Sequence, residues 1–386
     1  MGQRLGLLKE ILAHPLRRDR SAPPNPGGGC VLFHAINGIG LGHVSRLVAI
    51  AFALRELSPS TDLLFAVEGN SHGLLEAAKL PRVTFPAAPH IFSEPSDSWP
   101  RPRVERLIRS MAESITEVAG PNLIVFDCFP NRALVEVARR KGIPFAMCVR
   151  ASKDMDHYFE GLKAVLREAD VIIIPHHPGE ISVPADLAGK THFVGSIVRP
   201  VAETPGRAGP SEQRRLVLIS GGGGGYPGTV DFYNFALEAT AKCREAEPEL
   251  SALLVTGPLF HEWGRLKPVS GVRIIPFDPY ITNSFRRSSL VVCQAGYNTV
   301  AEIVSAGVPA ICVPAERKFD DQHERARATS AAHQQFHLWE GQDSESLSSL
   351  MLRLLRAPRT DGHAGADSKG STLAAEILIE SMARNR

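Results

Sequence analysis

The sequence predicts an α/β protein with two doubly wound parallel-sheet domains that face a central cleft. Short apolar runs recur along the chain, among them residues 30–36, 123–126 and 290–293. Runs of this length are typical of strands buried on both faces of a parallel sheet. Segments with helical periodicity separate them, as between residues 44 and 54. The chain has 386 residues, which is too long for one ordinary domain and suits two.

One proline-, glycine- and charge-rich segment divides the chain near its middle. Residues 199–215, RPVAETPGRAGPSEQRR, have no apolar period and therefore predict a linker. We expect a first domain at residues 30–198 and a second at 216–371. The last residues, 372–386, have a helical pattern.

The composition fits a folded protein that does not bind nucleic acid. Hydrophobic residues make up 44% of the chain and charged residues 22%, enough apolar material for two packed cores. The net charge of +2 indicates no polyanionic partner. The six cysteines are scattered without metal-ligand spacing, which predicts reduced thiols in a cytoplasmic protein. No apolar run approaches the roughly 20 residues that span a bilayer.

The N-terminal extension, residues 1–29, combines a narrow apolar stripe with a basic cluster and a proline-glycine connector. Such a segment could rest on an anionic membrane surface, which would make the protein peripheral at the inner membrane face. A loosely ordered extension, or a helix docked on the protein, is the favoured interpretation.

The stretch from residue 290 to 322 predicts a strand, a tight turn at Gly296, a short helix, a second strand and a polar loop. Asn298 or Thr299 is expected to cap the helix, whose N-terminus at the carboxyl edge of a parallel sheet is a ready anion site. The Glu302 carboxylate, one turn into this helix, could accept two hydrogen bonds from a ribose diol. Asp321 and Gln322 in the polar loop could bind hexose hydroxyls.

The motifs AGYNTVAE, AGVPAICVP and DDQ follow one another here as they do in GT-B glycosyltransferases. The sequence most closely resembles the group that includes MurG, the peptidoglycan-precursor N-acetylglucosaminyltransferase. The resemblance implies two Rossmann-like domains, a C-terminal helix that crosses back to the first domain, ribose binding by Glu302, and sugar binding by Asp321 and Gln322. The alternative is that Glu302 is a solvated helix residue and that DDQ caps a helix.

Ser220 is followed by five glycines: Gly221, Gly222, Gly223, Gly224 and Gly225. Placed between a strand and a helix, their backbone amides could converge on a diphosphate. Isolated polyglycine is more often a linker, but the MurG-like group has its diphosphate loop at this position. In that group the segment matching Phe277 and Asp278 holds the nucleotide base through its backbone.

In the first domain, a glycine-rich turn that contains Gly40 and Gly42 places His43 where a helix starts. An imidazole there could act as general base for an acceptor hydroxyl. Asp127 ends a strand at the same sheet edge, and the resemblance implies that it orients His43. The alternatives are that His43 and Asp127 cap helices. Arg150, in the charged loop 150–156, is a candidate acceptor contact, although charge runs are more often solvated surface.

These residues predict an inverting, metal-independent glycosyltransferase that moves N-acetylglucosamine or a related hexose from a nucleotide diphosphate, with UDP the first candidate. The acceptor would be a natural product or a lipid-linked envelope precursor, and no cofactor is needed beyond the nucleotide sugar. A nucleotide-sugar hydrolase of pseudaminic acid synthesis remains an alternative, because its GxGHxxR turn is similar to Gly40, Gly42, His43 and Arg46. A non-catalytic nucleotide-sugar binding protein is the third interpretation.

Overall fold

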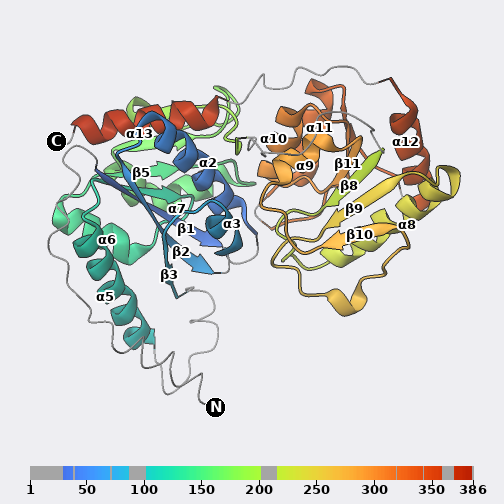
Figure 1. Ribbon diagram of the computed structural model, residues 1–386. Helices are drawn as coiled ribbons and strands as arrows, with labels where there is room; N and C mark the ends of the chain where they lie inside the picture. The colour runs from blue at the N-terminus through green and yellow to red at the C-terminus, as the bar shows by residue number, and fades with distance from the viewer. Residues whose placement is uncertain are drawn as a thin grey trace, which may run out of the picture.

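The computed structural model describes residues 29–37, 40–69, 72–86, 101–200, 215–318, 320–341, 343–358 and 369–384. It contains two parallel α/β sheets, one in each lobe of the molecule (Figure 1). This architecture confirms the predicted fold class. The proposed membrane contact at residues 1–28 and most of the predicted linker, residues 201–214, lie outside the described residues.

The first sheet has seven strands in the order β3-β2-β1-β4-β5-β6-β7, and each strand pair is parallel. Its elements are β1 (Cys30–Asn37), α2 (Gly42–Leu57), β2 (Asp62–Gly69), α3 (His72–Ala77), β3 (Arg82–Phe85), α5 (Arg101–Ala119), β4 (Leu123–Asp127), α6 (Arg132–Lys141), β5 (Phe145–Cys148), α7 (Met155–Glu168), β6 (Val171–Ile174), the 3-10 helix η1 (Ala188–Lys190) and β7 (Thr191–Phe193).

The second sheet has six parallel strands in the order β10-β9-β8-β11-β12-β13. Its elements are β8 (Leu216–Ser220), α8 (Thr229–Ala246), β9 (Ser251–Val255), the 3-10 helix η2 (Trp263–Arg265), β10 (Val272–Ile275), α9 (Ile281–Arg287), β11 (Leu290–Cys293), α10 (Tyr297–Ala306), β12 (Ala310–Cys312), α11 (Gln322–Ala332), β13 (Phe336–Leu338) and α12 (Ser344–Arg356).

Helices cover both faces of each sheet, because successive residues of a strand point to opposite sides. In β1, Val31 and Phe33 pack toward α2 and α3, whereas Leu32 packs toward α5, α6 and α7. In the second lobe, α8 and α12 cover one face and α9, α10 and α11 the other. Burial on both faces explains why the strands read as continuous apolar runs in the sequence.

The last helix, α13 (Gly370–Arg384), returns to the first lobe and lies along α2 (Figure 1). Its side chains Ala374, Leu378 and Met382 belong to the hydrophobic core that α2 forms with the first sheet. The Ser371 hydroxyl also donates a hydrogen bond to the carbonyl of Val198 (2.8 Å). The chain thus crosses between the lobes twice.

The start of α10 differs from the prediction. Its N-cap is Gly296, which offers no side-chain cap, so neither Asn298 nor Thr299 caps the helix. Both residues instead lie within the first turn, and the Asn298 side chain reaches the first lobe. The helix ends at Gly307, which adopts the left-handed conformation (φ 65°) that terminates many helices.

All six cysteines are free thiols, and Cys128, Cys148, Cys293 and Cys312 are buried as predicted. Among the described residues, no helix combines the length and apolarity needed to cross a bilayer.

The packing of α13 generates a stability prediction. We expect Leu378→Ala to lower the free energy of unfolding by about 2–5 kcal/mol, because it leaves a cavity in the first-lobe core. The matched control is Leu373→Ala on the same helix, whose side chain is 41% exposed, with an expected change within about 0.5 kcal/mol. Urea denaturation monitored by circular dichroism measures both. Equal effects would show that α13 does not dock on α2 in solution.

Candidate functional site

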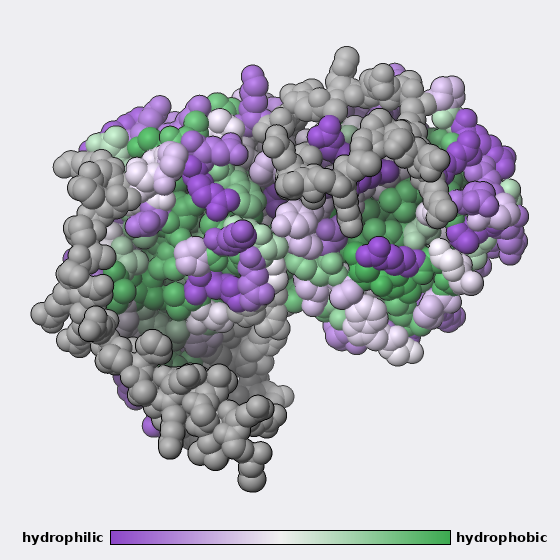
Figure 2. Space-filling view, in the orientation of Figure 1, coloured by the Kyte–Doolittle hydropathy of each residue, from purple (hydrophilic) through white to green (hydrophobic). Residues whose placement is uncertain are grey.

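A cavity of about 510 Å³ lies between the two lobes and is lined by residues of both. This volume is within the usual range for small-molecule sites. The lobes are in contact above a notch that separates them at the lower edge of the space-filling view (Figure 2). The backbones of two glycine turns, one from each lobe, approach each other closely: a Cβ atom on Gly223 would lie 3.0 Å from the Cα atom of Gly40.

The sheet topology explains why this cavity collects residues from distant parts of the sequence. In each sheet the strand order reverses between two central neighbours, β1 and β4 in the first lobe and β8 and β11 in the second. Ligands of open α/β sheets bind outside the carboxyl ends of the strands at this reversal. The predicted residues gather at the carboxyl ends of these four strands: His43 at the start of α2 after β1, Asp127 as the last residue of β4, the glycines after β8, and Gly296 after β11.

His43 and Asp127 are in direct contact, as predicted. The His43 Nδ1–H donates to Asp127 Oδ1 at 2.6 Å, which leaves Nε2 for a ligand. Asp127 is completely buried and His43 is 22% exposed at the cavity wall. Asn131 caps α6 through its side chain, and α2 has no side-chain cap, so neither Asp127 nor His43 serves as a helix cap.

The charge on this pair follows from its surroundings. Burial alone would lower the pKa of His43, but the hydrogen bond and negative charge of Asp127, together with the neighbouring Cys128, outweigh burial and raise it to about 9. Burial alone would raise the pKa of the Asp127 carboxyl, but Arg46 and His43 hold it well below its usual range. These pKa shifts favour a protonated imidazole beside an ionised carboxylate in the ligand-free protein at pH 7.

Arg46 is the third member of this network. Its Nε donates to Asp127 Oδ2 at 2.7 Å and its Nη2 to Oδ1 at 3.0 Å, although the side chain is only 1% exposed. Its Nη1 also donates to Asn298 Oδ1 of the second lobe at 3.4 Å. The sequence analysis noted Arg46 only in the turn similar to that of the hydrolase. Its spacing of three residues from His43 on α2 was the signal for a shared helix face.

In the second lobe, three of the five glycines face the cavity. Gly221, Gly222 and Gly223 line it together with Ser220, and Gly222 has a positive φ of 76° that favours glycine. A Cβ atom on Gly224 would instead meet the carbonyl oxygen of Thr256 and the Cβ and backbone nitrogen of Phe260. Gly225 is not part of the cavity wall either. Of the predicted diphosphate loop, the residues from Ser220 to Gly223 therefore lie at the cavity, and its role toward a diphosphate stays a prediction.

The N-terminus of α10 faces the glycine turn of the first lobe. Gly296, Asn298 and Thr299 line the cavity, and the first-turn amides of a helix have no acceptor within it. The Asn298 Nδ2 donates to the carbonyl of Gly42 at 2.8 Å, so this side chain connects the lobes. Gly42 thus contacts the second lobe through its backbone.

Glu302 lines the cavity, but its carboxylate already has a partner. Arg199 donates from Nε to Oε1 at 2.8 Å and from Nη2 to Oε2 at 3.3 Å, and its Nη1 donates to the carbonyl of Pro279 at 3.1 Å. Both side chains are largely buried. From the sequence, Arg199 was expected in the linker and not at the site, because the composition of residues 199–215 gives no sign of a contact with α10.

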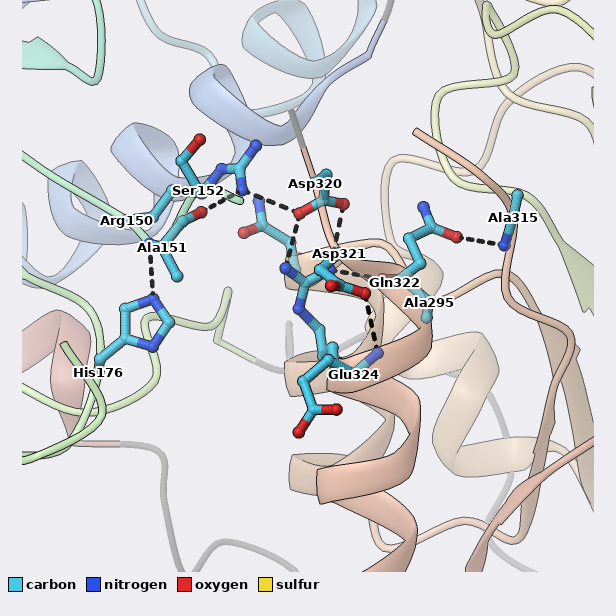
Figure 3. A network of polar contacts seen from close by, with 12 residues as sticks. Arg150, Ala151, Ser152, His176, Ala295, Ala315, Asp320, Asp321, Gln322 and Glu324 are labelled. Carbon is cyan, nitrogen blue, oxygen red and sulfur yellow. Dashed lines mark hydrogen bonds and ion pairs between the residues drawn. The ribbon is translucent and has the colours of Figure 1, made fainter. Parts of the chain in front are cut away.

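The polar loop after β12 differs from the prediction (Figure 3). Asp321 is exposed, is not part of the cavity wall, and caps α11 by accepting a hydrogen bond from the Glu324 amide at 3.0 Å. Asp321 therefore serves as the helix cap that the alternative interpretation named, and its role toward the donor sugar stays a prediction. Asp320 lines the cavity in its place, together with Gln322. The Gln322 Oε1 accepts a hydrogen bond from the Ala315 amide at 3.0 Å, which fixes its orientation.

Arg150 reaches across the cavity to Asp320, and the two side chains point toward each other in Figure 3. The Nη1 of Arg150 donates to Asp320 Oδ1 at 3.0 Å, and Arg325 donates to both carboxylate oxygens at 2.6 and 3.1 Å. Although burial would raise the pKa of Asp320, these arginines lower it. Arg150 lies at the cavity wall as predicted, and its role toward an acceptor stays a prediction.

Phe277 and Asp278 also line the cavity. The Phe277 ring packs against the core of the first lobe, and a Cβ atom on Gly73 of α3 would lie 3.2 Å from it. Asp278 accepts hydrogen bonds from the amide of Tyr280 and the hydroxyl of Ser284 at the start of α9. This segment therefore contributes to the cavity wall and also contacts the first lobe.

His43, Asp127 and Cys128 place three potential metal-ligand atoms within 4.8 Å of one another. The Arg46 guanidinium, however, already donates to both oxygens of the carboxylate. The positive charge of Arg46, in hydrogen-bond contact with Asp127, would repel a metal cation. The cluster is therefore better suited to an ion-pair network than to a metal.

Comparison with known proteins agrees with this geometry. Residues 217–375 match the glycosyltransferase family 28 C-terminal domain, which spans the half with the glycine loop and α10. The chain is 26% identical over 386 residues to the UDP-N-acetylglucosamine--N-acetylmuramyl-(pentapeptide) pyrophosphoryl-undecaprenol N-acetylglucosamine transferase of Rhizobium johnstonii (strain DSM 114642 / LMG 32736 / 3841), covering 93% of this chain and 96% of that enzyme.

Solved structures share the two-lobed arrangement at low sequence identity. Spinosyn forosaminyltransferase SpnP has a TM-score of 0.60 at 15% identity, covering 93% of this chain and 96% of its own. The glycosyltransferase SnogD from Streptomyces nogalater has a TM-score of 0.58 at 16% identity, covering 92% and 96%. With its second lobe matched to family 28 and both lobes matched in fold, this chain is a GT-B glycosyltransferase that is a distant homologue of MurG.

Proposed function

We propose that the protein transfers a hexose, N-acetylglucosamine or a related sugar, from UDP to an acceptor hydroxyl with inversion of the anomeric centre. The observation that carries this proposal is that His43, held by Asp127 in the first lobe, and the N-terminus of α10 in the second lobe line one cavity. The lobe of residues 30–198 would hold the acceptor, and that of residues 216–371 the nucleotide sugar.

The donor fits the second lobe end to end. The diphosphate would lie between the amides of Gly221 to Gly223 and the first turn of α10, where partial positive charge favours an anion. The ribose diol would contact Glu302, and the base would contact the backbone at Phe277. The sugar would then reach Asp320 and Gln322 near the first lobe. The activity of the related N-acetylglucosamine transferases favours UDP-N-acetylglucosamine as the first donor to test.

The reaction follows from these positions. The acceptor oxygen would form a bond to the anomeric carbon as the bond from that carbon to the diphosphate oxygen breaks, and UDP would leave with the electron pair. Backbone amides of the second lobe would stabilise the departing charge without a metal ion. The Nε2 atom of His43 would take the acceptor proton, and Asp127 would stabilise the resulting imidazolium.

Arg46 has a specific part in this mechanism. It shares the Asp127 carboxylate with His43, so part of the negative charge that would otherwise retain the imidazole proton is neutralised. It also contacts Asn298 at the N-terminus of α10. The base is thereby held in a fixed position relative to the donor site.

The direct test is incubation with UDP-N-acetylglucosamine, with and without candidate acceptors, followed by mass spectrometry. A transferase forms a glycosylated acceptor and releases UDP mainly when the acceptor is present. Rapid release of free sugar at the same rate in both mixtures would instead support the hydrolase. Absence of UDP binding would contradict the proposed donor.

The His43 network generates a pH prediction. Because only the neutral imidazole can accept a proton, transfer should rise with pH, about tenfold per unit, and level off near pH 9. Asp127→Asn should move this limb to lower pH, since the charge that retains the proton is lost. Arg46→Gln should move it to higher pH, since Asp127 then interacts with His43 alone.

Histidine-ring NMR titration of the ligand-free protein measures the same shifts without an acceptor. The control variant is His323→Gln, whose ring lies 47% exposed on α11 outside the cavity wall. A His43 pKa that is the same in the wild type, Asp127→Asn and Arg46→Gln would contradict the network.

A second prediction concerns the donor site. Saturating UDP at about 100 times its dissociation constant should stabilise the protein by about 2.7 kcal/mol. Glu302→Gln should weaken UDP binding about tenfold to a hundredfold, the usual effect of losing a hydrogen bond to a charged group. The control is Glu247→Gln, which is paired with Arg215 and Arg356 away from the cavity. Calorimetric titration with UDP measures both variants, and equal affinities would exclude Glu302 from ribose binding.

A further inference from the structure

The turn that follows β4 has an unusual backbone. Cys128 has a positive φ of 56°, a conformation that among non-glycine residues of the described chain it shares with Lys79 alone. The amide of Phe129 also donates to the carbonyl of Asp127 at 2.7 Å, which tightens the turn. Strained backbone of this kind persists only where its surroundings enforce it, and it is common at functional sites.

The surroundings of Cys128 do enforce this conformation. The hydroxyl of Tyr158 donates to the Cys128 carbonyl at 2.5 Å, and the Cys128 amide donates to the Cys148 carbonyl at 2.8 Å. Tyr158 is itself buried and packs against Phe129 with its ring centroid at 5.7 Å. The turn is therefore held rigidly from the side of the first lobe.

The two residues on either side of Cys128 differ in exposure. Asp127 is completely buried and holds His43, whereas Phe129 is 47% exposed and lines the cavity. The Phe129 ring centroid lies 6.4 Å from that of His43, with an angle of 70° between the ring planes. In the ligand-free protein, the apolar Phe129 ring beside His43 is therefore exposed to water, which is unfavourable.

Tyr226 is the other cavity residue with an exposed aromatic ring among the described large hydrophobic side chains. The Arg317 guanidinium lies 4.0 Å from the centroid of the Tyr226 ring, and the edge of the Tyr226 ring lies against Gly40. Arg317 and Gly40 thus cover part of the Tyr226 ring. Phe129, in contrast, packs against Tyr158 on one side and faces the cavity on the other.

We propose that Phe129 is the platform of an acceptor subsite that binds a six-membered ring by its apolar face and places a hydroxyl of that ring at His43 Nε2. The ring can be a pyranose or an aromatic ring, since both present a flat face of carbon atoms. Ile36 and Leu74 add apolar side chains to the cavity wall, and Glu68 adds a carboxylate at the end of β2. This inference rests on the proposed function, because it assigns the acceptor to the His43 side.

The test uses saturation-transfer NMR on the full chain in the presence of saturating UDP. Methyl β-D-glucopyranoside represents the pyranose ring, 2-naphthol the aromatic ring, and D-sorbitol an open chain with a comparable number of hydroxyls. We expect at least one ring probe to receive saturation and sorbitol to receive little. Comparison of the two ring probes shows which kind of ring the subsite prefers.

Phe129→Ala should reduce the ring-probe signal at least fivefold, and Phe129→Trp should retain it. The matched control is Trp263→Ala, whose ring is 45% exposed outside the cavity wall and whose loss should leave the signal unchanged. Ring probes that bind equally to the wild type and Phe129→Ala, or that bind to neither, would overturn the subsite. So would equal binding of sorbitol.

UDP affinity separates this inference from the proposed function. Phe129→Ala and Phe129→Trp should bind UDP as the wild type does, because Phe129 belongs to the first lobe and UDP is assigned to the second, and unchanged binding also shows that the variants are folded. If UDP fails to bind the wild type, the proposed function itself is contradicted. If UDP binds normally but ring binding does not depend on Phe129, the acceptor subsite alone is wrong.

Discussion

A buried negative charge organises the first lobe. Asp127 is inaccessible to solvent, and an isolated carboxylate in such a place is strongly unfavourable. Two cations from one helix compensate it, since His43 and Arg46 lie on the same face of α2. The Arg46 contact with Asn298 then links this charge to the second lobe. The position of the His43 imidazole, its proton affinity and its distance from α10 all depend on one carboxylate.

Close approach of backbones is the second constraint on the site. Gly223 and Gly40 belong to different lobes, yet a single methyl group on Gly223 would meet the other turn. Glycine at these positions lets backbone amides of the second lobe and the base of the first face one small cavity. Arg150–Asp320 and Arg199–Glu302 join the lobes at further points around the same cavity. These pairs occupy groups that a sugar or ribose would use, so ligand binding must compete with or extend them.

Much of the fold and part of the site could be predicted from local patterns. Apolar strand runs, Gly307 at the end of α10 and the loop positions after β1, β4, β8 and β11 are encoded within a few residues. The same patterns could not say which way each side chain points. Asp321 and Asp320 are adjacent and chemically identical, and the cap of α11 decided that Asp320 lines the cavity. Five consecutive glycines likewise do not reveal which of them line the cavity.

The sequence alone determined the α/β class and the placement of loops at the sheet edge, because strand burial and turn chemistry are local and periodic. It also supplied the residue types of the donor half, since a motif is a local string of residues. The tertiary structure decided the partners: Arg46 with Asp127, Arg199 with Glu302, and Phe129 beside His43. These contacts join residues distant in sequence, and ion pairing and burial depend on separation in space, which no local pattern encodes.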